Sequence, residues 1–296
     1  MRMSKIVAIA VLAAFAAGCR TGRSLSDMRA MCDQTITMPV ASFGQELTDV
    51  NMPPHLILLE ASITDEDGKP RKVPRLSVNG TPVESDGCTE GSSGFFYSCV
   101  GARMTGAIKH EPVACEDKVV AIRADAGCKH ECVAALLNAS TCAGIGKLLL
   151  LSSKGQNSVG ESGVIAFTVA RPPAPSWVSS NKDDPFAFDE DGLEEFEEPI
   201  PPPDDMAESD ANYREEWLLC AKRSIDIGRD EIVHAHKRVD DVDALDAQFE
   251  EIAKDPRLKG KSIYISCASD SEHKALVEVL SILYKHGFKR CYIFSM

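Results

Sequence analysis

The sequence predicts an α+β protein with two small sheet domains of βαβ type, joined by a disordered, acidic, proline-rich linker. The main observation is a segment that occurs twice: residues 118–153 align without a gap to residues 261–296, at an offset of 143 positions. Each copy has a short apolar run, a helical period, a glycine and a second apolar run, which is typical of strand, helix and strand.

An apolar stripe at helical spacing defines the helix of each copy. In the second copy the stripe is Leu276, Val279, Leu280 and Leu283. In the first copy the matching positions are Val133, Leu136, Leu137 and Ser140. Gly144 and Gly287 follow the stripes, where a left-handed residue often ends a helix.

Near-continuous apolar runs flank each helix. They are Val119–Ile122 and Leu148–Leu151 in the first copy, and Ile263–Ile265 and Cys291–Phe294 in the second. Such runs predict strands covered on both faces, or parallel strands joined by a crossover helix.

The first domain should span residues 38–171. Strands are expected at Leu56–Leu59 and Leu76–Val78, with turns at residues 65–68 and at Asn79-Gly80, and a further strand at Gly163–Ala170.

The second domain should span residues 215–296. Trp217–Cys220 and Ile225–Ile227 are strand candidates. Asp241 is expected to cap a helix that carries Val242, Leu245, Phe249 and Ile252.

The linker, residues 172–214, explains the charge of the chain. Residues 183–216 hold 15 Asp and Glu and one Arg, whereas the whole chain has a net charge of −13. The rest is close to neutral, so nucleic acid is not expected as a partner. The segment is either a solvated spacer or an acidic recognition segment anchored by Phe186, Phe188 and Phe196.

Residues 1–19 have the form of a lipoprotein signal peptide. A basic start precedes the apolar stretch Ile6–Ala17, which is short for a transmembrane span, and Ala16-Ala17-Gly18-Cys19 resembles a bacterial lipobox. Cys19 is therefore the expected lipidation site. An ordinary cleaved signal and a retained anchor are the alternatives. We expect a cell-envelope protein that faces the periplasm, with the outer membrane favoured because Arg20, not Asp, follows the cysteine.

The order of these elements resembles the periplasmic domain of the ExbD/TolR family. The resemblance rests on the helix at Asp243–Lys254 with the repeated unit behind it, on Val120–Asp125, which is similar to the family's I-x-A-D signature, and on Leu76–Val83, which resembles its small hairpin. It covers about 150 residues in two pieces.

The resemblance implies a biopolymer-transport component, with an ExbB/TolQ-like channel as a partner. The proton step of the family needs a carboxylate in a transmembrane helix, and Ile6–Ala17 contains none. We therefore expect a non-enzymatic interaction protein without a cofactor, accessory to an energy-coupling complex. Family members dimerise, so an intramolecular pseudo-dimer of the two copies, or a homodimer, is expected. The alternative is a peptidoglycan- or envelope-binding scaffold unrelated to proton coupling.

The chain has 11 cysteines, and an exported protein meets an oxidising setting. Cys88–Cys99 and Cys128–Cys132 are the nearest candidate disulfides, although the sequence does not fix the connectivity. Cys267 and Cys291 are expected to be small apolar core residues.

The segment Cys128-Lys129-His130-Glu131-Cys132 is the best metal candidate, but a fourth ligand is not evident, so no metal is expected. A third functional hypothesis gives Cys128 and Cys132 a redox role, although their spacing is not the Cys-x-x-Cys usual for a redox pair. His130 and His273 occupy equivalent positions and are expected to be partly exposed.

Overall fold

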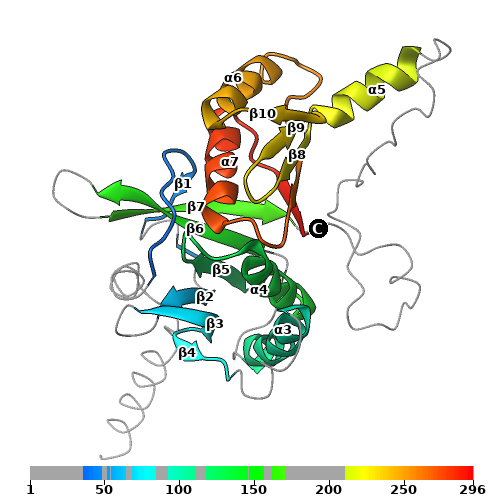
Figure 1. Ribbon diagram of the computed structural model, residues 1–296. Helices are drawn as coiled ribbons and strands as arrows, with labels where there is room; N and C mark the ends of the chain where they lie inside the picture. Colours follow the sequence, from blue (N-terminus) through cyan, green and yellow to red (C-terminus); the bar gives the residue numbers. More distant parts are fainter. Residues whose placement is uncertain are drawn as a thin grey trace, which may run out of the picture.

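The computed structural model describes residues 36–48, 52–53, 55–64, 69–84, 93–110, 118–145, 147–156, 162–170 and 211–295. These residues form a large mixed sheet with helices packed against it, which confirms the α+β class (Figure 1). The expected signal peptide with Cys19, the linker up to residue 210 and Cys88 lie outside the described residues.

The two repeats have the same order of elements over more than the 36 residues visible in the sequence. The first contains β2 (Leu56–Thr64), β3 (Pro70–Val78), β4 (Thr81–Pro82), α3 (Ser93–His110), β5 (Val119–Ala124), α4 (His130–Cys142) and β6 (Lys147–Gln156). The second contains β8 (Ser224–Ile227), β9 (Ile232–His234), β10 (Lys237–Val239), α6 (Val242–Ile252), β11 (Ile263–Cys267), α7 (His273–Lys285) and β12 (Cys291–Ser295). Outside this common order lie β1 (Gln45–Glu46), β7 (Ser162–Ala170) and α5 (Ala211–Ala221).

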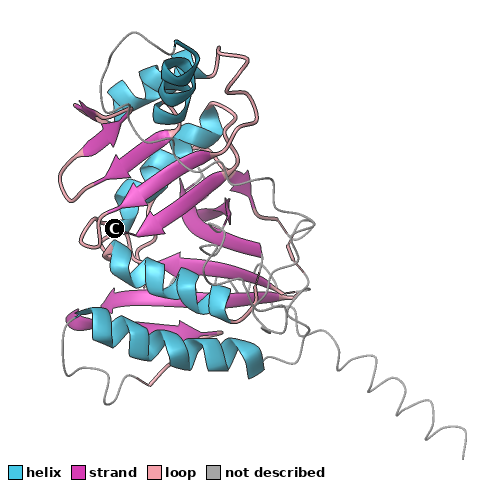
Figure 2. Cartoon of the chain, turned by 90° about the vertical axis from the view of Figure 1, so that its right-hand side faces the viewer, coloured by secondary structure: helices cyan, strands magenta, loops and turns pink. Residues whose placement is uncertain are grey.

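In the described residues all the strands belong to one 12-stranded sheet, in the order β10-β9-β8-β11-β12-β7-β6-β5-β2-β3-β4 with β1 beside β7. The repeats thus extend in opposite directions from β7, and Figure 2 shows their strands following one another along the molecule. This differs from the expectation of two separate sheets, because β7 pairs with β6 on one side and with β12 on the other.

Equivalent positions of the two repeats pair with the same residue of β7. Val169 of β7 lies opposite Leu148 of β6 and opposite Cys291 of β12, and these two partners are equivalent positions of the repeat. The strand β6 is antiparallel to β7 whereas β12 is parallel to it. Such an arrangement is expected of two related units that face each other across a strand shared by both.

Several local signals have the expected outcome. Asn79 and Gly80 have positive φ angles (52° and 77°) in the turn between β3 and β4, and Ala235 and His236 (51° and 60°) form the equivalent turn between β9 and β10. The carboxylate of Asp241 accepts a 2.7 Å hydrogen bond from the Ala244 amide and caps α6. Gly144 and Gly287, with φ of 81° and 88°, follow α4 and α7.

Two helices differ from the expectation. Trp217–Cys220 lies in α5 and not in a strand, since four apolar residues do not distinguish the two states and the preceding Arg and Glu favour helix. The helix α3 was not expected, because Gly101 and Gly106 weaken its propensity. Packing determines it: Val100, Met104 and Ile108 are buried at a spacing of four residues, and α3 lies against α4.

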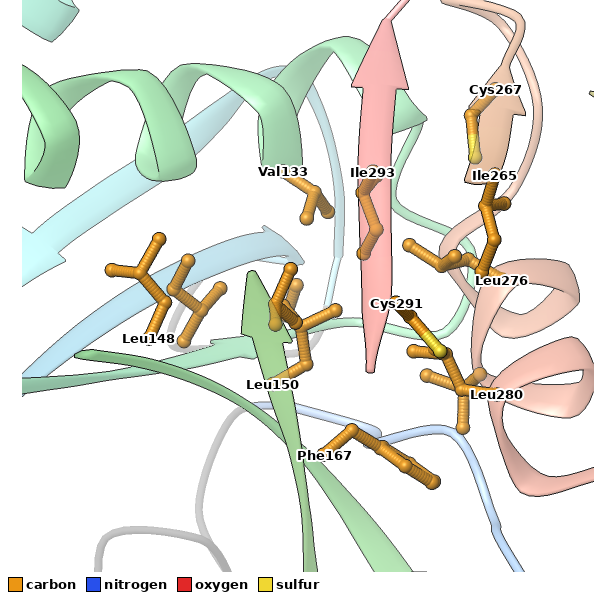
Figure 3. Close-up of a cluster of buried hydrophobic side chains, with 14 of the residues drawn as sticks. Val133, Leu148, Leu150, Phe167, Ile265, Cys267, Leu276, Leu280, Cys291 and Ile293 are labelled. Atoms are coloured by element: carbon orange, nitrogen blue, oxygen red, sulfur yellow. The ribbon is translucent and has the colours of Figure 1, made fainter. Parts of the chain in front are cut away.

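One hydrophobic core is shared by both repeats. Figure 3 shows Val133 of α4 beside Ile293 of β12, with Phe167 of β7 near Cys291 and Leu280. All of these side chains are buried. Burial of apolar area contributes roughly 25 cal/mol per Å², so this common core should couple the stabilities of the two repeats.

Candidate functional site

The turns that precede α4 and α7 meet through backbone hydrogen bonds. The amide of His130 donates to the carbonyl of Ser271 (2.8 Å), and the amide of His273 donates to the carbonyl of Cys128 (2.7 Å). A second pair runs from the Glu131 amide to the Ser269 carbonyl (3.0 Å) and from the Lys274 amide to the Ala126 carbonyl (2.9 Å).

Each of these bonds has a counterpart that is obtained by adding or subtracting 143 residues. The contact is therefore isologous, as at the interface of a symmetric dimer, but it lies within one chain. The bridge between Lys129 and Glu272 joins a residue to its own equivalent, so the local two-fold axis passes between them. A second point on the axis is Val169, which lies between Leu148 and Cys291.

The imidazoles of His130 and His273 are the unusual groups at this contact. They are 1% and 0% exposed, and neither ring nitrogen of either side chain has a hydrogen-bond partner in the described part of the chain. Burial lowers the pKa of His130 to about 4. Burial, and next the neighbouring charge of His130, lowers the pKa of His273 to about 3. Both imidazoles are neutral at pH 7.

The expectation that both histidines are partly exposed was wrong. Taken alone, each occupies the first turn of a helix, which is usually accessible. The physical reason for burial is the contact between the two turns, because each turn covers the other. A sequence signal did exist, since these two residues are among the few identities between the copies.

Two thiols lie beside this contact. Cys128 and Cys132 are fully buried and do not form the disulfide considered from the sequence. A hydrogen bond with the Cys132 thiol, and burial next, raises the pKa of the Cys128 thiol. A buried thiol with a raised pKa is a poor nucleophile, which weighs against a redox role for Cys128.

The other cysteines have separate roles. Cys99 is disulfide-bonded, while its candidate partner Cys88 lies outside the described residues, so this pairing stays a prediction. Cys267 and Cys291 are free and fully buried, as expected of core residues. Burial raises the pKa of each of these two thiols to about 12.

The carboxylate of Asp125, the acidic residue of the I-x-A-D segment, has a structural task. It accepts hydrogen bonds from the amides of Thr37 (2.6 Å) and Ile63 (2.8 Å), and it is 3% exposed. The Ala126 amide returns a bond to the Thr37 carbonyl (2.8 Å). Asp125 thus fixes the segment before β1 beside the turn that leads to His130.

The sheet faces that point away from the helices differ between the repeats. In the first repeat this face is covered by a second buried cluster, which includes Leu47, Leu56, Leu58, Ala121, Leu149, Leu151, Val164 and Ala166. In the second repeat, Tyr264, Tyr292 and Phe294 are only half-buried at the equivalent face. The rings of Tyr264 and Tyr292 stack with centroids 5.7 Å apart, and Arg223 lies over Tyr264.

Metal binding finds no support in the described ranges, where no group of three or more His, Cys, Asp or Glu side chains could hold an ion. None of the helices described is both long and apolar enough to span a membrane. No protein-family model, no curated protein and no solved structure matches the chain.

Proposed function

We propose that this protein is a lipid-anchored, periplasm-facing interaction protein with two ExbD/TolR-like modules, accessory to an energy-coupling complex of the bacterial cell envelope. The proposal assigns it no enzymatic step. The N-terminal signal with Cys19 would hold it on a membrane, with the outer membrane favoured, and the modules would bind proteins of the envelope.

The observation that carries the proposal is the isologous contact between the repeats. Members of the family dimerise through their periplasmic domains, and a single chain with two paired modules is the covalent counterpart of such a dimer. Further support comes from the element order, because hairpin, helix, strand, helix and strand occur in both repeats.

The half-buried aromatic face of the second repeat is the surface we assign to the protein partner. Aromatic and arginine side chains dominate binding energy at protein interfaces. Tyr264, Tyr292 and Phe294 supply half-buried aromatic rings on one sheet face, and the buried Arg223 lies over the Tyr264 ring and supports it from within. The equivalent positions of the first repeat form an internal core and offer no such surface.

The test is affinity purification of the full-length chain from detergent-solubilised membranes, with a tag inserted near Pro201 and mass spectrometry of the recovered proteins. We expect an ExbB/TolQ-like channel protein with the wild type and at least tenfold less of it with the Tyr264→Ala/Tyr292→Ala variant. A Lys289→Ala variant, changed at an exposed site, serves as the matched control.

The competing function is an envelope scaffold that binds peptidoglycan without any link to proton coupling. Recovery of wall-associated proteins alone, together with retention on purified cell wall, would favour the scaffold and overturn the link to an energy-coupling complex.

A further inference from the structure

We propose that His130 and His273 form an acid-sensitive contact between the two repeats, which closes at neutral pH and opens in mild acid when the imidazoles take up protons. This inference goes beyond the proposed function and does not rest on it. It rests on where the two side chains lie: each is the first residue of its helix, at the isologous contact, and each is buried there without a polar partner.

The contact is able to open because few bonds close it. The two turns are joined by the four backbone hydrogen bonds between residues 126–131 and residues 269–274, two of which form the bridge between Lys129 and Glu272. These turns follow strands at their ends, so separating them does not require the ladder between β5 and β6 or between β11 and β12 to break.

Charged groups around the pair do not compensate a proton on either ring. The charged side chains on the two turns are Asp125, Lys129 and Glu131 in the first repeat, and Asp270, Glu272 and Lys274 in the second. In the described structure, Asp125 is bonded to backbone amides, and Glu272 pairs with Lys274 at 2.8 Å. Lys129 and Asp270 are exposed, and Glu131 is half-exposed.

Of the strands packed against α4, β5 and β2 bring Arg123 and Glu60, which pair with each other at 3.0 Å. The charged side chains described on α3, which also packs against α4, are Arg103, Lys109 and His110, and all three are exposed.

A hydrogen bond with the Cys132 thiol, and burial next, raises the pKa of the Cys128 thiol, and β12, which packs against α4, brings Ile293 and the buried thiol of Cys291. An imidazolium formed here would stay desolvated and without a partner, while its neighbour carried the same charge. Both effects disfavour the closed state.

The direction and the size of the pH effect on the contact follow from the difference in histidine pKa between the closed and the open state. A histidine whose pKa is lower in the closed state, about 4 for His130 and about 3 for His273, stabilises that state fully above its ordinary pKa of about 6.5. The contribution is lost as the pH falls below that value. Each ring shifts the ratio of open to closed molecules about tenfold between pH 7.5 and 5.5, so the pair shifts it about 100-fold.

The test is hydrogen exchange of the full chain at pH 7.5 and 5.5, read by mass spectrometry and corrected for the intrinsic pH dependence of exchange. We expect protection of the His130, Glu131, His273 and Lys274 amides to fall about 100-fold in acid. Amides in the middle of α6, which is remote from the two turns in sequence, should fall much less. Equal protection of the two turns at both pH values would overturn the proposal.

Variants separate the imidazoles from other acid effects. The double variant His130→Leu/His273→Leu should lose the pH dependence, and each single variant should keep about a tenfold effect. His236→Gln, at an exposed histidine stacked on Trp217, should keep the full effect. An unchanged acid response in the double variant would refute the role of the pair.

If the double variant does not fold, a measurement on the wild-type chain still tests the role of the two imidazoles. NMR titration of the imidazole protons should show that His130 and His273 remain neutral in the closed state at pH 5.5. Titration of both rings near pH 6.5 without loss of the contact would contradict the proposal.

Discussion

Replacing Phe167 by alanine tests whether the two repeats share one core. Phe167 belongs to β7, is 0% exposed, and its ring meets that of Tyr284 on α7 edge-on, with centroids 5.1 Å apart. The amide of the next residue, Thr168, donates a 2.9 Å hydrogen bond to the Tyr284 hydroxyl. Phe167 precedes the linker and α7 follows it. The substitution therefore breaks a contact between the two parts of the chain that the linker joins.

We expect Phe167→Ala to lower the free energy of unfolding by about 4 kcal/mol. Removal of a buried phenylalanine costs about 3–5 kcal/mol, and the aromatic pair accounts for roughly 1 kcal/mol of that loss. Urea unfolding followed by circular dichroism measures the total. Hydrogen exchange shows which elements lose stability, and protection of the α7 amides should decrease together with that of the β6 amides.

Tyr284→Phe is the matched control, because it keeps the ring and removes only the hydroxyl. Its expected cost is about 1 kcal/mol, the net worth of one hydrogen bond. If Phe167→Ala left the protection of α7 unchanged while that of β6 fell, the repeats would be independent domains and the shared core would be refuted.

Two further substitutions test single contacts. Asp125→Ala removes the acceptor of the Thr37 and Ile63 amides, so we expect a loss of about 3 kcal/mol in urea unfolding and faster exchange of both amides; unchanged exchange would show that the carboxylate does not hold the segment. Asp241→Ala removes the cap of α6, with an expected loss of about 1 kcal/mol, whereas Asp241→Asn should keep most of the stability.

Several elements within each repeat, though not α3 or the hairpin of β9 and β10, could be predicted from local signals. The stripe of Leu276, Val279, Leu280 and Leu283 is buried as expected, Asp241 caps its helix, and Asn79-Gly80 forms its turn. These features depend on a few neighbouring residues. The equivalent turn at Ala235-His236 carries no glycine or asparagine, so the second hairpin had no comparable signal.

The arrangement of the repeats could not be predicted in the same way, because it depends on contacts between residues far apart in the chain. An apolar run such as Gly163–Ala170 predicts a strand but does not say that it pairs with both repeats. The burial of His130 and His273 comes from the contact between the two turns, which also joins residues far apart in the chain, and so the expectation that both are partly exposed was wrong. The helix α3 was not predicted because its glycines lower the helix propensity, and its buried face is recognised only from its packing against α4.

The most direct test of the isologous contact is a cross-link between Lys129 and Glu272. Bridged residues of antiparallel segments have Cα atoms about 4.5–5.5 Å apart, within the roughly 7 Å that a disulfide spans. We expect Lys129→Cys/Glu272→Cys to form a disulfide within one chain under mild oxidation, found by mass spectrometry, and neither single variant to join the two peptides. Folded protein without this cross-link, or with it only between two chains, would show that the two turns do not meet within one molecule.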